Sequence, residues 1–172
     1  MHSGNETMSC SVARAVDAIG DRWTVLILRE AFWGVRRFES FQANLGIARN
    51  VLSDRLRRLA AHGILERVSL TPGGKRAEYH LTRKGADLFR VLVVLMQWGD
   101  RWTHDGEPPV RLIARTNGEP IAEMAVRDSD GRALGLMEMR PEPGPGANDA
   151  TRRRLAAVPG GAGSRYQSDR ST

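Results

Sequence analysis

The sequence predicts a mainly helical fold with a small β component, of the α+β class, followed by a short β-rich C-terminal appendage. Apolar residues recur at helical spacing through most of residues 12–103. Two helical stretches meet at a single glycine, Gly46, and two β-prone runs then flank a Pro-Gly-Gly turn at residues 72–74. A helix, a turn, a second helix and a hairpin in this order describe a winged helix-turn-helix.

Two helices are expected before this unit. Residues 12–19 place apolar side chains on one face, and Gly20 provides a natural stop. Asp21 is then in position to cap a second helix over residues 22–33, which is apolar on nearly all sides. Such a helix belongs at the centre of the domain.

The next two helices are expected over residues 38–45 and 48–62. In the second of them Leu52, Leu56 and Leu59 fall on one face, which predicts that this face packs on the core. The same stretch holds four arginines but a single acid, Asp54. Its exposed face is therefore basic, as expected for a helix that enters the major groove of DNA.

Residues 65–70 and 76–81 are expected to form the hairpin strands, with residues 71–75 as the loop. Thr82 then begins a long helix to about residue 103. Its apolar surface exceeds what one small domain covers, which predicts a homodimer held by this helix and the first helix. The residues expected at the dimer interface are Val12, Val16, Leu88, Leu92, Leu95, Trp98 and Trp102.

The chain changes character after two prolines at residues 108–109. Apolar clusters at residues 110–114, 121–126 and 134–139, separated by turn residues, predict a three-stranded β meander in an appendage at residues 110–140. Residues 141–172 are rich in Pro, Gly, Ser and Arg, which predicts a disordered tail with one helical turn at residues 150–157. Residues 1–9 are expected to be flexible.

The composition narrows the class of partner. The chain carries a net charge of +6 and a pI of about 10.6, which favours an acidic polymer, although solubility alone would also account for it. A single cysteine excludes an intrachain disulfide. The N-terminal residues do not resemble a signal peptide, and the longest apolar run, residues 91–96, is too short to span a membrane. We therefore expect a cytoplasmic protein with no membrane partner.

Individual residues can be assigned to contacts with double-stranded DNA. Recognition helices enter the major groove with their N-terminal half, where arginine can bond guanine and asparagine can bond adenine through paired hydrogen bonds. The expected base-reading residues are Arg49, Asn50, Ser53 and Arg57. The expected contacts with the DNA backbone come from Arg36, Arg37, Ser40, Arg55, Arg58, Lys75 and Arg76. For Arg55, a structural ion pair with a carboxylate is an equal alternative.

Several segments together resemble the HxlR-type regulators, a bacterial branch of the winged helix-turn-helix proteins near the MarR group. They are Cys10, IGDRWTVLILREAFWGVRRFESFQANL at residues 19–45, GIARNVLSDRLRRLAAHGILER at residues 46–67, AEYHLTRKGADL at residues 77–88, and Trp98. The resemblance covers residues 10–104 and implies a dimeric, cytoplasmic, DNA-binding transcriptional regulator. Some longer relatives carry cysteines before a glycine such as Gly118. Residues 114–117 hold none here, so a metal-binding knuckle is not expected.

Two groups of residues leave alternatives open. Cys10 is either inert packing or a redox sensor, because some relatives of that family sense oxidants through a cysteine here and Arg14 could lower its pKa. The tryptophans either pack in the core and the dimer interface or line a pocket for an unidentified small-molecule effector. They are Trp23, Trp33, Trp98 and Trp102.

The sequence offers little support for catalysis. Its four histidines are scattered without metal-ligand spacing, and no glycine-rich phosphate loop occurs. We therefore expect no enzymatic activity, no cofactor and no bound metal. The leading interpretation is a homodimeric repressor that reads a pseudo-palindromic operator, with activation left open. The rival is a winged-helix module that binds a ligand or a protein partner without specific DNA binding.

Overall fold

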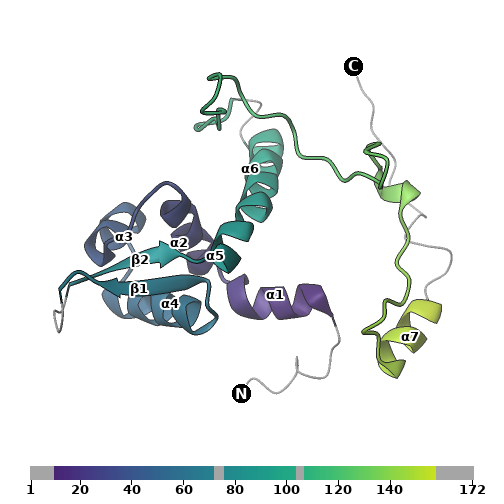
Figure 1. Cartoon of the computed structure of the whole chain (residues 1–172), viewed down its shortest axis with the longest axis horizontal. Coiled ribbons are helices and arrows are strands. Elements are labelled where there is room, and N and C mark those ends of the chain that lie inside the picture. The colour runs from purple at the N-terminus through teal and green to yellow at the C-terminus, as the bar shows by residue number, and fades with distance from the viewer. Residues whose placement is uncertain (1–9, 72–75, 104–106, 158–172) are drawn as a thin grey trace. The chain divides into compact units, whose positions relative to one another are not determined.

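The computed structural model describes residues 10–71, 76–103 and 107–157 (Figure 1). The described chain divides into two compact units, one formed by residues 14–122 and the other by residues 10–13 with 123–157. The first unit combines helices with one two-stranded antiparallel sheet. The predicted fold class, a mainly helical winged helix-turn-helix, is confirmed.

The first two helices lie where the sequence predicts them. Helix α1 spans Ser11–Ile19 and helix α2 spans Arg22–Phe32. The carboxylate of Asp21 caps α2, because its Oδ1 accepts hydrogen bonds from the backbone amides of Trp23 and Thr24 at 3.0 and 3.1 Å. Three apolar side chains of α2 are almost fully buried at the centre of the unit: Ile27, Leu28 and Ala31.

Helices α3 (Phe38–Leu45) and α4 (Arg49–Ala61) form the helix-turn-helix. Gly46 ends α3 with a φ of 59°, a left-handed conformation that favours glycine, and its amide bonds the carbonyl of Gln42. This single residue turns the chain so that α4 can begin at Arg49. The buried side chains of the two helices and their turn are Phe41, Ile47, Leu52, Leu56 and Leu59.

The wing is an antiparallel hairpin of β1 (Leu65–Ser69) and β2 (Ala77–Leu81). Its register pairs Leu65 with Leu81 at one end and Ser69 with Ala77 at the other. The chain just before α3 adds to the other edge of β2, where the amide of Tyr79 bonds the carbonyl of Arg36 at 2.8 Å. The predicted hairpin loop lies largely outside the described residues.

The long helix predicted from Thr82 is divided in the structure into α5 (Arg83–Asp87) and α6 (Phe89–Thr103). Thr82 caps α5 as predicted, accepting from the amide of Gly85 at 3.0 Å. The break occurs because the amide of Leu88 bonds the carbonyl of Gly85, three residues back, which tightens this turn. A Cβ on Gly85 would lie 2.1 Å from the carbonyl oxygen of Ile64, so the glycine lets α5 approach the start of the wing.

The predicted three-stranded meander is wrong in extent, because the described residues there form only isolated bridges, at Ile113–Pro120 and Arg127–Ala133. Side chains here bind backbone amides that would otherwise pair between strands. The Oδ1 of Asp128 accepts hydrogen bonds from the amides of Asp130 and Arg132. Within the third predicted strand, residues 136–138 form a 3₁₀ turn, and the side chain of Glu138 accepts from the amide of Gly135.

Helix α7 (Asp149–Ala156) follows, capped by the side chain of Asn148 at 2.9 Å from the amide of Thr151. It matches the helical turn predicted at residues 150–157. The remaining part of the predicted tail, residues 158–172, lies outside the described residues.

Candidate nucleic-acid interface

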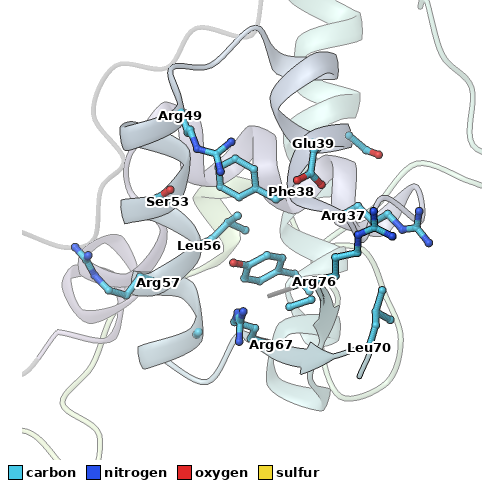
Figure 2. A pocket seen from close by; sticks show the side chains of 14 residues that line it. Arg37, Phe38, Glu39, Arg49, Ser53, Leu56, Arg57, Arg67, Leu70 and Arg76 are labelled. Atoms are coloured by element: carbon cyan, nitrogen blue, oxygen red, sulfur yellow. The ribbon is translucent and has the colours of Figure 1, made fainter. Parts of the chain in front are cut away.

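A groove of about 970 Å³ lies between the start of α3, the exposed side of α4 and the wing (Figure 2). Leu56 and Tyr79 belong both to its wall and to the core, which fixes the wall to the rest of the unit. The groove is lined by Arg37, Phe38, Glu39, Ser40, Arg49, Ser53, Leu56, Arg57, Ala60, Arg67, Leu70, Arg76, Ala77 and Tyr79.

The groove is strongly basic, because five of the lining residues are arginines and one, Glu39, is acidic. Arginine guanidinium groups bind phosphate and guanine through paired hydrogen bonds, and an open basic groove beside an exposed helix suits a charged polymer. The arrangement therefore provides a surface for an anionic chain rather than an enclosed catalytic site.

Three of the four predicted base-reading residues line this groove: Arg49, Ser53 and Arg57. All three are exposed, as is the fourth, Asn50, which lies outside the groove lining. The guanidinium of Arg49 lies 4.9 Å from the centre of the Phe38 ring, a cation–π contact between α4 and α3. The sequence pattern thus placed the exposed face of α4 correctly.

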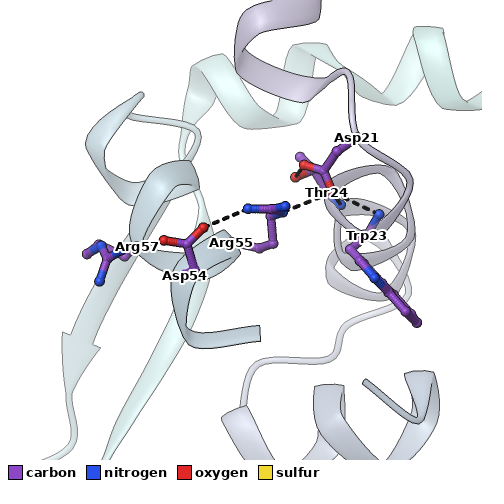
Figure 3. A network of polar contacts seen from close by, with 6 residues as sticks. All are labelled: Asp21, Trp23, Thr24, Asp54, Arg55 and Arg57. Atoms are coloured by element: carbon purple, nitrogen blue, oxygen red, sulfur yellow. Dashed lines mark hydrogen bonds and ion pairs between the residues drawn. The ribbon is translucent and has the colours of Figure 1, made fainter. Parts of the chain in front are cut away.

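Arg55 has a different environment from the other arginines of α4. Its Nε lies 3.0 Å from Oδ1 of Asp21 at the start of α2, and its Nη1 lies 2.6 Å from Oδ2 of Asp54 (Figure 3). The structure therefore shows the alternative that the sequence left open for this residue, an ion pair that holds α4 against α2. Arg58, also predicted to contact the DNA backbone, is half-buried and does not line the groove.

Two of the predicted backbone-contacting residues before α4, Arg37 and Ser40, are exposed and line the groove. Arg37 also lies 3.5 Å from Glu78 on β2. Arg36 instead points back to α2, where its Nη1 donates to the carbonyls of Ala31 at 2.7 Å and Val35 at 3.2 Å. The guanidinium of Arg36 thus provides hydrogen bonds to backbone carbonyls at and just after the C-terminal end of α2.

On the wing, Arg76 lines the groove as expected, whereas Lys75 lies outside the described residues. Sequence reasoning missed Arg67 and Tyr79, which also line it and stand opposite each other in the hairpin register. The alternation of a strand contained the signal: Arg67 lies two residues from the buried Leu65 and shares its face, which is turned toward α4.

The residues predicted for a dimer interface fall into two groups. Leu88 and Leu92 are partly buried against the core of their own chain. The others are about half exposed or more in the single chain, with Val12 at 71% and Trp102 at 62%: Val12, Val16, Leu95, Trp98 and Trp102. Phe89, Val91 and Val94 enlarge the exposed apolar surface of α6. Of the tryptophans, Trp23 packs on the core and Trp33 is half exposed.

Cys10 stands immediately before α1. Hydrogen bonds from the backbone amides of Ala13 and Val12 lower the pKa of its thiol below the usual 9.0. Arg14, the group suggested by the sequence, is not among the causes of this lowered pKa. In the described part of the chain no cluster of His, Cys, Asp and Glu is arranged to hold a metal, and none of the described helices is long and apolar enough to cross a membrane.

Comparison with known proteins gives concordant matches. A family model described as HxlR-like helix-turn-helix matches residues 18–107. An uncharacterised HTH-type transcriptional regulator of Mycobacterium bovis is 47% identical over 137 residues, covering 79% of this chain and 87% of the relative. The crystal structure of PA1607, described as a candidate transcription factor, superposes with a TM-score of 0.75 at 42% identity and covers 80% of this chain and 97% of its own. A second candidate transcription factor, from Pseudomonas aeruginosa, gives 0.59 at 36% identity, with 84% and 99% covered.

Proposed function

Because the chain belongs to the HxlR-like helix-turn-helix family of transcriptional regulators, we propose that it is a homodimeric repressor that reads a pseudo-palindromic DNA operator. The observation that carries the proposal is the basic groove between α4 and the wing. The family and its relatives are regulators rather than enzymes. We place the activity in the cytoplasm, where a bacterial chromosome lies.

In this proposal the exposed side of α4 enters the major groove. Arg49, Asn50, Ser53 and Arg57 meet base edges there, with the arginines suited to guanine and the asparagine to adenine. Buried Leu52, Leu56 and Leu59 on the opposite face support this role, because they leave the polar face free to project into DNA.

The rest of the basic groove holds the sugar–phosphate backbone. Arg37 and Ser40 at the start of α3 and Arg67 and Arg76 on the wing surround the exposed side of α4. Contacts of this kind fix the register of the protein on DNA but carry no sequence information. Arg36, Arg55 and Arg58 were expected to act in the same way, and the contacts described above favour a structural role for the first two.

Dimerisation would use the exposed apolar side chains of α1 and α6. Large apolar surface left open in one chain is costly in water, and a second copy can cover it. A two-fold axis would then present two copies of α4 to successive major grooves, about 34 Å apart along the duplex. Two half-sites per dimer would account for a pseudo-palindromic operator, and occupation of a promoter would block transcription.

The proposal is tested by selecting bound genomic fragments with the purified protein and titrating the best fragment at two salt concentrations. We expect specific binding whose affinity falls steeply with salt, because neutralised phosphates release their counterions. Arg49→Ala and Asn50→Ala should flatten sequence preference, each by about 1–3 kcal/mol, whereas Arg76→Ala should weaken all sequences alike. Absence of any sequence preference at low salt in a folded sample would instead support the rival winged-helix module.

Whether the protein represses or activates transcription is tested separately. A reporter gene placed behind the selected operator should be expressed less when the wild-type protein is present. Arg49→Ala protein, with its fold checked by thermal unfolding, should restore expression. Increased expression with wild-type protein would make the chain an activator.

A further inference from the structure

Asp54 holds an unusual position among the arginines of α4. It is the single acid in this helix, and its carboxylate lies between two guanidinium groups (Figure 3). One oxygen, Oδ2, accepts from Arg55 at 2.6 Å, and the other, Oδ1, pairs with Nη2 of Arg57 one turn further along. Arg57 is the most exposed of these residues, with 75% of its side chain open to solvent.

The carboxylate that meets Arg57 is itself fixed from behind. Arg55 also forms an ion pair with Asp21, with 3.0 Å between Arg55 Nε and Asp21 Oδ1. Asp21 is in turn bound by the first turn of α2, through the amides of Trp23 and Thr24 and the hydroxyl of Thr24. The chain of contacts therefore runs from Asp21 at the start of α2, through Arg55 and Asp54, to Arg57 on the proposed DNA-reading face.

This arrangement differs from an ordinary surface ion pair. An isolated pair three residues apart on a helix contributes little, because both side chains remain mobile. Here the acid is only 38% exposed and its other oxygen is occupied, so Arg57 meets a fixed partner. Guanidinium carries five donors in a rigid fork, and a carboxylate that occupies one of them leaves others for a base edge.

The negative charge has a second consequence. A carboxylate next to Arg57 disfavours the close approach of a phosphate, whereas the acceptor atoms of guanine carry no full charge. Asp54 thus opposes the use of Arg57 as a non-specific phosphate anchor and leaves its role as a base reader intact.

We propose that Asp54 is a specificity-determining positioning residue, which orients Arg57 for one base of the operator and disfavours its binding to the backbone of unrelated DNA. This inference rests on the proposed function. It concerns the ratio between affinities for the operator and for a random duplex, rather than affinity alone.

The test measures that ratio for Asp54→Asn, a variant of nearly the same shape without the charge. Asp87→Asn is the matched control, because Asp87 is an exposed acid on α5 and its replacement changes the net charge equally. We expect Asp54→Asn to lower the ratio about tenfold, within the range for one arginine–base contact, with increased affinity for random DNA. Asp87→Asn should leave the ratio unchanged. Asp54→Glu, which keeps the negative charge, should retain part of the wild-type ratio.

A variant lacking Arg57 separates positioning from stability. In an Arg57→Ala background, Asp54→Asn should have no further effect on the ratio, because its target is gone. Thermal unfolding of each protein checks the fold, and Asp54→Ser provides a second variant for the same comparison if Asp54→Asn unfolds.

Three outcomes would overturn the inference. Equal changes with Asp54→Asn and Asp87→Asn would show a general effect of charge. An undiminished loss in the Arg57→Ala background would show that Asp54 acts elsewhere. If Arg57→Ala leaves the ratio intact while Arg49→Ala lowers it, the proposed function stands and the inference fails. Loss of the proposed function itself would appear differently, as an absence of sequence preference in the wild-type protein.

Discussion

Replacing Asp21 should destabilise the winged helix-turn-helix in a way that can be divided into two contributions. Its carboxylate caps α2 through the amides of Trp23 and Thr24, and it also lies 3.0 Å from the guanidinium of Arg55 on α4. Loss of a helix cap costs about 0.5–2 kcal/mol. The ion pair contributes less, about 0.2–1 kcal/mol, because both side chains are roughly a quarter to a third exposed.

We therefore expect Asp21→Ala to lower the free energy of unfolding by about 1–3 kcal/mol at neutral pH, measured by urea denaturation. Asp21→Asn is the informative comparison, because asparagine caps helices as well as aspartate does but cannot pair with Arg55 as an anion. Its loss should stay below about 1 kcal/mol. Equal losses for the two variants would refute the assignment of a capping role to Asp21.

The pH dependence gives an independent check. Burial tends to raise the pKa of Asp21, but hydrogen bonds from the side chain and amide of Thr24, together with Arg55, outweigh it and hold the pKa below the usual 3.8. A carboxyl group with a lowered pKa in the folded state contributes stability above its unfolded pKa and loses it as pH falls through the folded value. The difference between wild type and Asp21→Asn should be constant down to about pH 4 and then shrink. A difference that persists unchanged well below that range would contradict the ion pair.

Three further outcomes are expected. Arg67→Ala should weaken binding to all DNA sequences and reduce the slope of log affinity against log salt concentration by about one. Glu66→Ala, on the other face of β1, should not weaken binding. Fluorescence anisotropy titrations measure both, and equal effects would contradict the placement of Arg67. Leu95→Glu and Trp102→Glu should convert the dimer to monomers, as measured by light scattering, with little loss of protomer stability. The reason is that both side chains are about half exposed or more in one chain. Dimers of unchanged affinity would exclude α6 from the interface. Alkylation of Cys10 should reach half its maximal rate at a lower pH in folded than in urea-unfolded protein, because backbone amides stabilise the thiolate; identical profiles would refute this.

The parts of the fold that sequence predicted well are those determined over short distances along the chain. The spacing of Leu52, Leu56 and Leu59 is sufficient to orient α4, and Gly46 is sufficient to end α3. The exposed arginines of the proposed DNA-reading face follow from that orientation. Asp21 was recognised as a cap because a capping residue acts on amides two and three positions away.

The parts that sequence did not predict depend on contacts between distant residues. Nothing in the neighbourhood of Arg55 indicates that Asp21, 34 positions earlier, would meet it, and nothing near Arg36 indicates its bond to the end of α2. The predicted meander failed for a related reason. Apolar clusters favour strands, but the side chains of Asp128 and Glu138 bond nearby amides and leave only isolated bridges.

The division of the long helix has a consequence for the proposed dimer. Thr82 donates to the carbonyl of Gly63 at 2.6 Å, and Lys84 donates to the carbonyl of His62 at 2.7 Å, so α5 is bonded to the end of α4. Leu88 and Leu92 continue this attachment by packing on the core, whereas other apolar side chains of α6, from Phe89 onward, are exposed. One continuous segment thus joins the end of α4, the proposed DNA-reading helix, to the proposed dimer surface. Because that joint is held by hydrogen bonds and packing, the spacing of the two half-sites would be set by the geometry of α5 and α6 rather than by a flexible linker.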